Sequence, residues 1–182
     1  MSTQQEKFMT AKGKVVYQSI YRENVYKGQG TGKYVLKIAF DEKETKRLQA
    51  LIKTALKGMK SPRYTGFKKD ESGQVTFTFK SNVTSKDGEP RVINVFDAKK
   101  RLVKHPLPIG KGSEMKVSFV IFTTDEGASL YMNQLQLLKL EKYSGSCDFE
   151  EEDGWDGSDE EETDEEFDAE GFLSDAEGSE EY

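Results

Sequence analysis

The sequence is poor in the residues that build disulfides and zinc sites. It contains one cysteine and one histidine in 182 residues. A single cysteine cannot form an internal disulfide framework, so the expected environment is a reducing compartment. The two residues together cannot supply the Cys/His ligands of a zinc site. We therefore expect a protein without a structural metal and without a cofactor.

Long apolar runs are also missing. The best one, at residues 117–122, is far too short for a bilayer, which needs about 20 apolar residues. Residues 1–10 are polar and do not resemble a secretory signal peptide. These absences predict a non-secreted protein that makes no contact with a membrane.

Positive charge is absent from the C-terminal end. Residues 147–182 carry 19 acidic side chains and no lysine or arginine, whereas residues 1–146 carry 14 acidic and 27 basic ones. A segment of the latter length can bury one ordinary core. The acidic segment has few apolar residues and repels itself. We predict a flexible N-terminal arm (1–11), a folded basic domain (12–146) and a disordered acidic tail (147–182).

Alternating apolar and polar residues predict β-strands. The pattern is clearest at 32–40, where Leu36 and Ile38 would face a core and Lys33, Val35 and Lys37 would face outward. The other expected strands are 13–21, 74–83, 91–96, 115–124 and 129–140. The alternation of the last one slips near residues 133–134, as a β-bulge would cause.

One segment has helical periodicity instead. Residues 41–59 place apolar side chains, Leu48 and Ile52 among them, on one face. Asp41 is a candidate N-cap, with Glu44 three residues later. Five or six strands with glycine-rich turns and one helix predict an all-β fold, an OB-fold-like barrel of five to six strands. The helix follows the second strand, whereas a generic OB barrel has it after the third.

No motif indicates catalysis. The glycine-rich segment 28–33 fails as a phosphate loop, because Lys27 stands where the motif needs glycine and Tyr34 stands where it needs serine or threonine. His105 has no identifiable partner. The acidic residues of the basic domain are scattered and form no metal motif. A nuclease stays an alternative that cleavage of DNA with Mg²⁺ would reveal.

Nucleic-acid binding is indicated by outward lysines and aromatic residues on the strands and by a similar mixture in the loop at 61–73. Bases can stack on exposed rings while lysine and arginine neutralise phosphates. The candidates for DNA contact are Lys33, Lys37, Arg63, Tyr64, Phe67, Lys80, Lys116, Phe122 and Tyr131. The alternative for each ring is packing under the helix, the N-terminal arm or a dimer partner, and we favour packing for Tyr64 and Phe67.

The acidic tail ends in Glu180, Glu181 and Tyr182. A tethered polyanion competes with phosphates for a basic groove at an effective concentration of about millimolar. DNA in the groove would release the tail, which would then bind basic patches on other proteins. The terminal tyrosine would supply an apolar anchor.

The chain resembles the single-stranded DNA-binding proteins of bacteriophage replisomes, of the T-odd coliphage type. The resemblance lies in the order of short segments: GKYVLKI at 32–38, VTFTFK at 75–80, INV at 93–95, PIG at 108–110, GS at 112–113, KV at 116–117, GAS at 127–129 and the acidic tail with its terminal aromatic residue. A helix after the second strand is usual in this family.

This resemblance implies an OB fold and sequence-independent binding, protection and annealing of single-stranded DNA in phage replication, recombination and repair. It implies contact of the tail with the replicative DNA polymerase and the helicase-primase, in the cytoplasm of an infected bacterium. Lys80 matches a basic DNA-contact position, and Tyr182 replaces the more usual phenylalanine. Apart from the resemblance, exchange of the acidic tails between two protomers would form a homodimer. The alternative class is an acidic-tailed chaperone or regulator that binds basic proteins.

Overall fold

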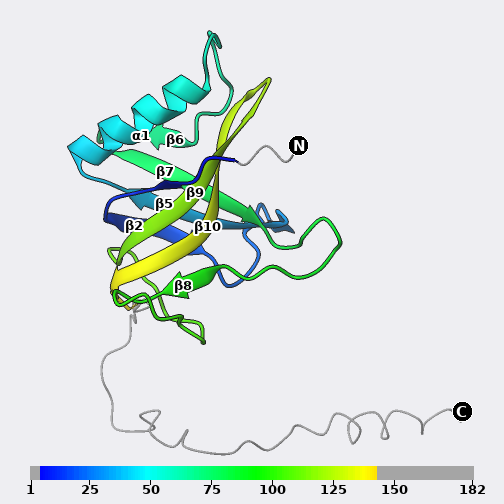
Figure 1. The fold of residues 1–182 in the computed structure, drawn as a ribbon, viewed down its shortest axis with the longest axis vertical. Helices are drawn as coiled ribbons and strands as arrows, with labels where there is room; N and C mark the ends of the chain where they lie inside the picture. Colours follow the sequence, from blue (N-terminus) through cyan, green and yellow to red (C-terminus); the bar gives the residue numbers. More distant parts are fainter. Residues whose placement is uncertain (1–4, 143–182) are drawn as a thin grey trace, which may run out of the picture. The chain divides into compact units, whose positions relative to one another are not determined.

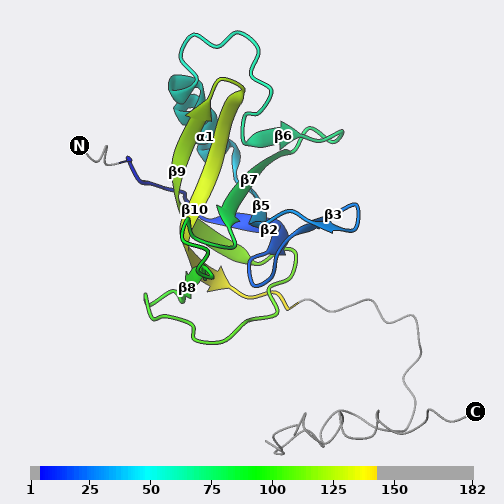
Figure 2. The same ribbon diagram turned by 90° about the vertical axis from the view of Figure 1, so that its right-hand side faces the viewer.

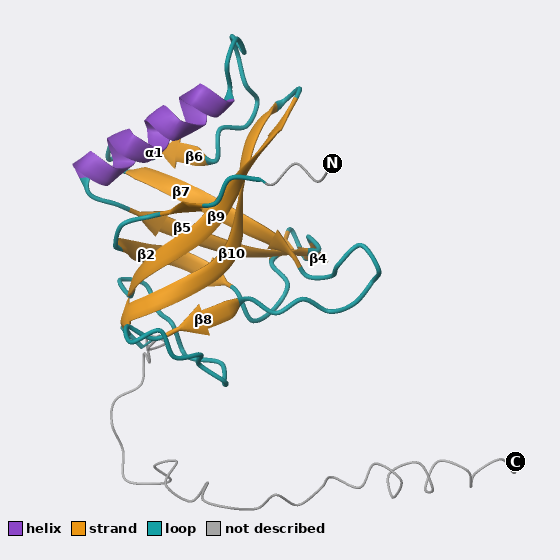
Figure 3. Ribbon diagram, in the orientation of Figure 1, coloured by secondary structure: helices purple, strands orange, loops and turns teal. Residues whose placement is uncertain are grey.

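The computed structural model describes residues 5–142. In this part of the chain, strands wrap into a barrel with one helix at the end where β6 lies (Figures 1 and 3). The predicted acidic tail and the predicted boundary after residue 146 lie outside the described residues.

Five strands close the barrel. They are β2 (Gly13–Ser19), β5 (Lys33–Ala39), β7 (Val75–Asn82), β9 (Glu114–Thr124) and β10 (Gly127–Lys139). Antiparallel pairs join β2 to β5, β5 to β7, β10 to β9 and β9 back to β2, while β7 and β10 are parallel. The predicted all-β barrel with one helix is confirmed. The short β8 (Asn94–Phe96) pairs with β10 outside this ring.

The helix α1 (Glu42–Ala55) follows β5, as the sequence predicted. Asp41 caps it, since its Oδ1 accepts a hydrogen bond of 2.8 Å from the backbone N–H of Glu44. Leu48 and Ile52 are buried in the core. The helix ends four residues earlier than predicted, at Ala55, and Gly58 follows with a positive φ of 79°.

Three short pairings escaped the sequence patterns. The strand β1 (Phe8–Met9) pairs with β9, β3 (Val25–Tyr26) pairs with β4 (Gln29–Gly30), and β6 (Phe67–Lys69) pairs with β7. Each strand has only two or three residues, which is too few for alternation to be read. Figure 2 shows β6 and the β3–β4 hairpin projecting from the same side of the barrel.

The barrel interior is built on aromatic residues. Phe77, Phe79 and Phe119 are almost completely buried, and the rings of Phe79 and Phe119 meet edge to face with centroids 5.2 Å apart. Two residues on the outer face of the barrel are nevertheless buried. Val35 and Val120 hold outward positions yet are only 6% and 9% exposed.

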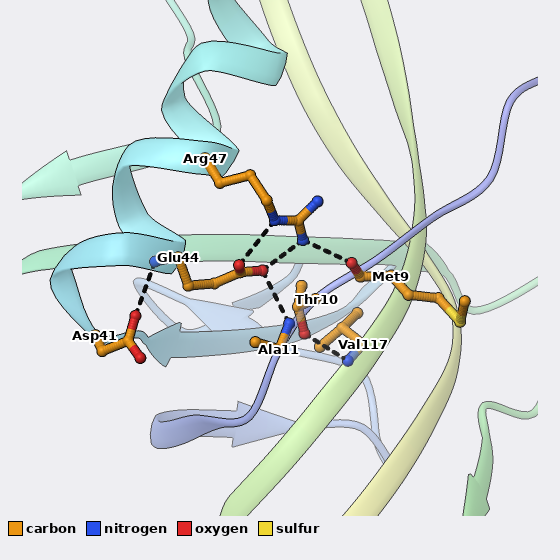
Figure 4. A network of polar contacts seen from close by, with 7 residues as sticks. All are labelled: Met9, Thr10, Ala11, Asp41, Glu44, Arg47 and Val117. Carbon is orange, nitrogen blue, oxygen red and sulfur yellow. Dashed lines mark hydrogen bonds and ion pairs between the residues drawn. The ribbon is translucent and has the colours of Figure 1, made fainter.

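A network of polar contacts ties the N-terminal segment to the helix (Figure 4). The buried carboxylate of Glu44 accepts hydrogen bonds from the backbone N–H of Ala11 at 2.8 Å and from Arg47 Nε at 2.8 Å. Arg47 Nη2 also donates to the carbonyl of Met9 at 2.8 Å. The hydrogen bonds from Arg47 hold the pKa of Glu44 below its ordinary value, against the opposing effect of burial.

Thr10, which follows Met9, joins the same N-terminal segment to β9. Its backbone N–H donates to the carbonyl of Val117 at 2.9 Å, and the N–H of Val117 donates to Thr10 Oγ1 at 3.0 Å. Residues 8–11 are therefore part of the barrel, whereas the sequence analysis assigned them to a flexible arm. The cause is a pairing with residues more than 100 positions away, which local composition does not reveal.

Candidate nucleic-acid interface

One row of outward residues crosses four strands. Val35 on β5 lies opposite Lys80 on β7, Lys80 lies opposite Tyr131 on β10, and Tyr131 lies opposite Val120 on β9. Directly opposed residues share one face of a sheet. The row thus combines two nearly buried valines with one cation and one aromatic ring, which suits contact with a base and its phosphate.

Tyr131 is the centre of a cluster on this face. Lys33 Nζ donates a hydrogen bond of 3.1 Å to the Tyr131 hydroxyl and another of 3.0 Å to Asn82 Oδ1. The ring of Phe122, which is 47% exposed, lies 5.8 Å from the Tyr131 ring between centroids. We call Lys33, Lys80, Phe122 and Tyr131 the Tyr131 cluster.

A hollow of about 320 Å³ adjoins the cluster. It lies between the loop before β6, β7 and the start of β10, and its lining is Arg63, Tyr64, Thr65, Gly66, Phe67, Lys68, Thr78, Lys80, Ala128, Ser129 and Leu130. The Arg63 guanidinium lies 5.4 Å from the centre of the Tyr64 ring. Because Lys80 belongs to both the hollow and the cluster, the two form one continuous surface.

The two loop aromatics have different surroundings. The ring of Phe67 packs against that of Phe77 with centroids 5.6 Å apart, which agrees with the packing interpretation. Tyr64 is 48% exposed, so its ring is available to a ligand, contrary to the interpretation that we favoured.

The tip of the β9–β10 hairpin fixes the Tyr64 loop. The backbone N–H groups of Arg63 and Tyr64 point to the Glu126 carbonyl at 2.7 and 3.3 Å, and the Ala128 N–H donates to the Tyr64 carbonyl at 2.9 Å. A Cβ atom at Gly127 would lie 2.0 Å from that carbonyl oxygen, and φ there is 152°. Only glycine fits, so the loop and the hairpin tip are held together.

The remaining two candidates lie apart from the cluster. Lys37 is on the same face of β5 as Lys33, but its Nζ lies 5.8 Å from the ring of Tyr17 on β2. Lys116 is six positions before Phe122 on β9, which is about 20 Å along a strand. It lines a separate hollow of about 490 Å³ with Met9, Phe96 and Lys100. The structure thus brings seven of the nine candidates together.

Two exposed aromatic residues were missed in the sequence. Tyr17 is 44% exposed and Tyr26 is 65% exposed, and each has a lysine near its ring, Lys37 and Lys27 respectively. For Tyr17 the sequence held no signal of this exposure, because strict alternation from Val15 places it in the core and only the bulge in β2 turns it outward.

Two kinds of feature are absent from the described residues. Across residues 5–142, no group of three or more His, Cys, Asp or Glu side chains is placed to hold a metal ion. In the same range, no helix has both the length and the apolar character needed to cross a membrane.

Comparison with solved structures identifies the architecture. Gp2.5, a single-stranded DNA-binding protein encoded by bacteriophage T7, matches with a TM-score of 0.56 and 20% identity over 85% of this chain and 100% of that one. The single-stranded DNA-binding protein from bacteriophage Enc34, in complex with ssDNA, matches with a TM-score of 0.51 and 12% identity over 76% and 88%. No family model and no curated protein matches the sequence. The chain therefore shares the fold of bacteriophage single-stranded DNA-binding proteins.

Proposed function

We propose that this protein binds single-stranded DNA without sequence preference and has no catalytic activity. The observation that carries the proposal is the continuous surface formed by the Tyr131 cluster and the Arg63–Tyr64 hollow. It combines the exposed rings of Phe122 and Tyr64 and the half-buried ring of Tyr131 with lysine and arginine on the outer face of a barrel. Two solved proteins that share the fold are described as single-stranded DNA-binding proteins, which supports the proposal.

In the proposed mechanism, aromatic rings contact the bases and cations contact the phosphates. Bases stack on Tyr131, Phe122 and Tyr64, and each stacked base contributes about 1–3 kcal/mol. Lys33, Lys80 and Arg63 neutralise phosphates. Stacking accepts any base, because every base has a π-face, so sequence preference is weak. Phosphate neutralisation makes the affinity depend steeply on salt.

The biological setting follows from the resemblance to phage proteins. In this proposal the protein coats and protects single strands during replication, recombination and repair of phage DNA, and it promotes their annealing. Its place is the cytoplasm of the infected bacterium.

The acidic tail regulates the same surface in our proposal. With 19 acidic residues and no basic one, residues 147–182 are a tethered competitor for the cations of the basic domain. DNA displaces the tail. The freed tail, ending in Glu180, Glu181 and Tyr182, then recruits the DNA polymerase and the helicase-primase. Exchange of tails between two protomers would give a homodimer.

Binding of the full-length chain to a labelled oligothymidine tests the central claim. We expect binding that weakens as salt is raised, and an intact oligonucleotide after incubation with Mg²⁺. An acidic-tailed chaperone would instead leave the oligothymidine free and bind a basic protein. Cleavage of the oligonucleotide would identify a nuclease and contradict the non-enzymatic function.

A further inference from the structure

A bulge in β2 turns Tyr17 outward. Val15 pairs with Ile38, but the next pair joins Tyr17 to Lys37, so Val16 is the extra residue. Strict alternation from the buried Val15 would place Tyr17 in the core. The bulge instead leaves Tyr17 44% exposed, on the face that carries Lys37. Bulges re-aim side chains in this way near functional sites.

The Tyr17 ring is held in place by the connection between β2 and β5. Its hydroxyl donates a hydrogen bond of 2.7 Å to Asn24 Oδ1. The backbone N–H of Asn24 donates to the Lys33 carbonyl at 2.8 Å, and its own carbonyl accepts from the N–H and the hydroxyl of Thr31. A ring already fixed in an exposed position loses little conformational freedom when a ligand binds to it.

Basic residues lie near this ring and in the hollow that it borders. Lys37 Nζ lies 5.8 Å from its centroid on one side. Tyr17 also borders a hollow of about 430 Å³, lined by Val15, Val16, Tyr17, Gln18, Arg22, Pro108, Ile109, Gly110 and Lys111. Among the described residues that line this hollow, none is acidic. An exposed ring beside one lysine, at the border of a hollow lined by Arg22 and Lys111, has the composition of a base-stacking site.

We propose that Tyr17 is a second base-stacking subsite for single-stranded DNA, with Lys37 neutralising the adjacent phosphate. Arg22 and Lys111 extend the charge beyond it. This inference rests on the proposed function and extends its site from the Tyr131 cluster across β5 to β2.

The distance between the two subsites sets the length of DNA that is required. The path from Tyr131 to Tyr17 crosses three strand pairs: β10 to β7, β7 to β5 and β5 to β2. It also moves two residues along β5, from Val35 to Lys37. Three strand spacings and this step place the two tyrosines about 16 Å apart. An oligonucleotide that reaches only the Tyr131 cluster cannot touch Tyr17, whereas a longer one contacts both.

Binding of oligothymidines of about 2 to 16 nucleotides tests this subsite, because the single backbone step of a dinucleotide is too short to bridge the two tyrosines, whereas longer oligonucleotides reach both. The full-length chain is compared with Tyr17→Ala, Tyr17→Leu and Tyr17→Phe by fluorescence anisotropy. We expect Ala and Leu to weaken binding of the longest oligonucleotide by about 5- to 140-fold and to leave the shortest unaffected. Phe keeps the ring and should bind like the wild type.

Lys37→Ala provides a second test that leaves the Tyr17 hydrogen bond intact. It should lower the salt dependence of binding, as a log–log slope, by about 0.7 for long oligonucleotides only. Thermal unfolding of each variant shows whether the barrel is preserved.

Three results have distinct meanings. If long oligonucleotides bind Tyr17→Ala and Lys37→Ala as tightly as the wild type, the subsite does not exist. Equal losses at every length would also overturn it, because Tyr17 would then act on the barrel as a whole. If the wild-type chain binds no oligothymidine, the proposed function itself is wrong.

Discussion

Lys33 Nζ lies 3.1 Å from the hydroxyl oxygen of Tyr131, although the two residues are 98 positions apart in the chain. The contact joins β5 to β10 across the intervening β7. It holds a cation at the edge of an aromatic ring on the outer face of the barrel, beside Phe122. One nucleotide would use both groups, the ring for its base and the ammonium group for its phosphate.

Replacing Tyr131 separates the role of the ring from that of its hydroxyl. Tyr131→Ala should weaken binding of oligothymidine by about 1–3 kcal/mol, because a stacking surface is lost. Tyr131→Phe keeps the surface and loses only the hydrogen bond from Lys33, so it should bind nearly as the wild type does. Fluorescence anisotropy at fixed salt measures both. Equal losses in the two variants would contradict a stacking role.

Lys80 should contribute through charge alone. Lys80→Ala removes one phosphate contact, and the log–log slope of affinity against salt should become shallower by about 0.7. The matched control is Lys46→Ala, which removes a lysine that is exposed on α1 and already paired with Glu42 at 2.6 Å. Titrations at several salt concentrations measure the slopes. The same slope for Lys80→Ala and the wild type would show that Lys80 touches no phosphate.

Truncation after Ser146 should tighten DNA binding, since the competing carboxylates are removed. The gain should be largest at low salt and should shrink as salt screens the tail. Competition titrations of the full-length and truncated chains with one labelled oligonucleotide measure the difference. Unchanged affinity at low salt would remove the tail from the regulation of the site.

The terminal aromatic residue should matter for proteins rather than for DNA. Tyr182→Ala should leave DNA affinity nearly unchanged, because it removes no charge from the side chains of the tail. It should weaken binding to the DNA polymerase, because the apolar anchor is lost. Surface-based binding measurements with immobilised polymerase test this, with Tyr182→Phe as the control. Full polymerase binding by Tyr182→Ala would disprove the anchor.

The contacts of Glu44 should make stability fall in acid. Its pKa is lowered in the folded protein, first by the hydrogen bonds from Arg47. This stabilisation is therefore fully present above the ordinary pKa of 4.5 and is lost as the pH falls through the lowered value. Glu44→Gln should cost about 1.5–3 kcal/mol near neutral pH and progressively less in acid.

Urea unfolding of the wild type and Glu44→Gln across the acid range measures that difference. The other carboxylates are common to both chains, so their titrations cancel. If the difference in stability between the wild type and Glu44→Gln is the same at neutral pH and in strong acid, the contacts with Arg47 and Ala11 do not depend on the ionised carboxylate.

Local sequence patterns were sufficient to predict the helix cap, the strand alternation and the bulge. The N-cap at Asp41, the alternation around Leu36 and the slip in β10 were all predicted, and the structure places a register shift between Met132 and Gln134. What could not be predicted depends on long-range pairing. The strand β1 forms because Phe8 and Met9 meet Phe119 and Ser118, and no property of residues 8–9 alone reveals that partner.

The candidate site was predictable only as a set of residue types. The outward positions of Lys33, Lys80 and Tyr131 follow from alternation, but their proximity depends on the parallel pairing of β7 with β10. Tyr17 was missed because a bulge reversed its direction. The Tyr64 loop is placed by backbone contacts with the tip around Gly127, which join two turns that are far apart in sequence.

The order in which the strands of the barrel pair affects how the chain folds during translation. The strand β9 pairs with β2, with β1 and with β10, and β7 finds its parallel partner only in β10. The ring cannot close until Leu130 and Tyr131, which pair with β7, have left the ribosome. Nascent chains therefore expose unpaired strand edges for most of translation, and folding should be slow for a domain of this size.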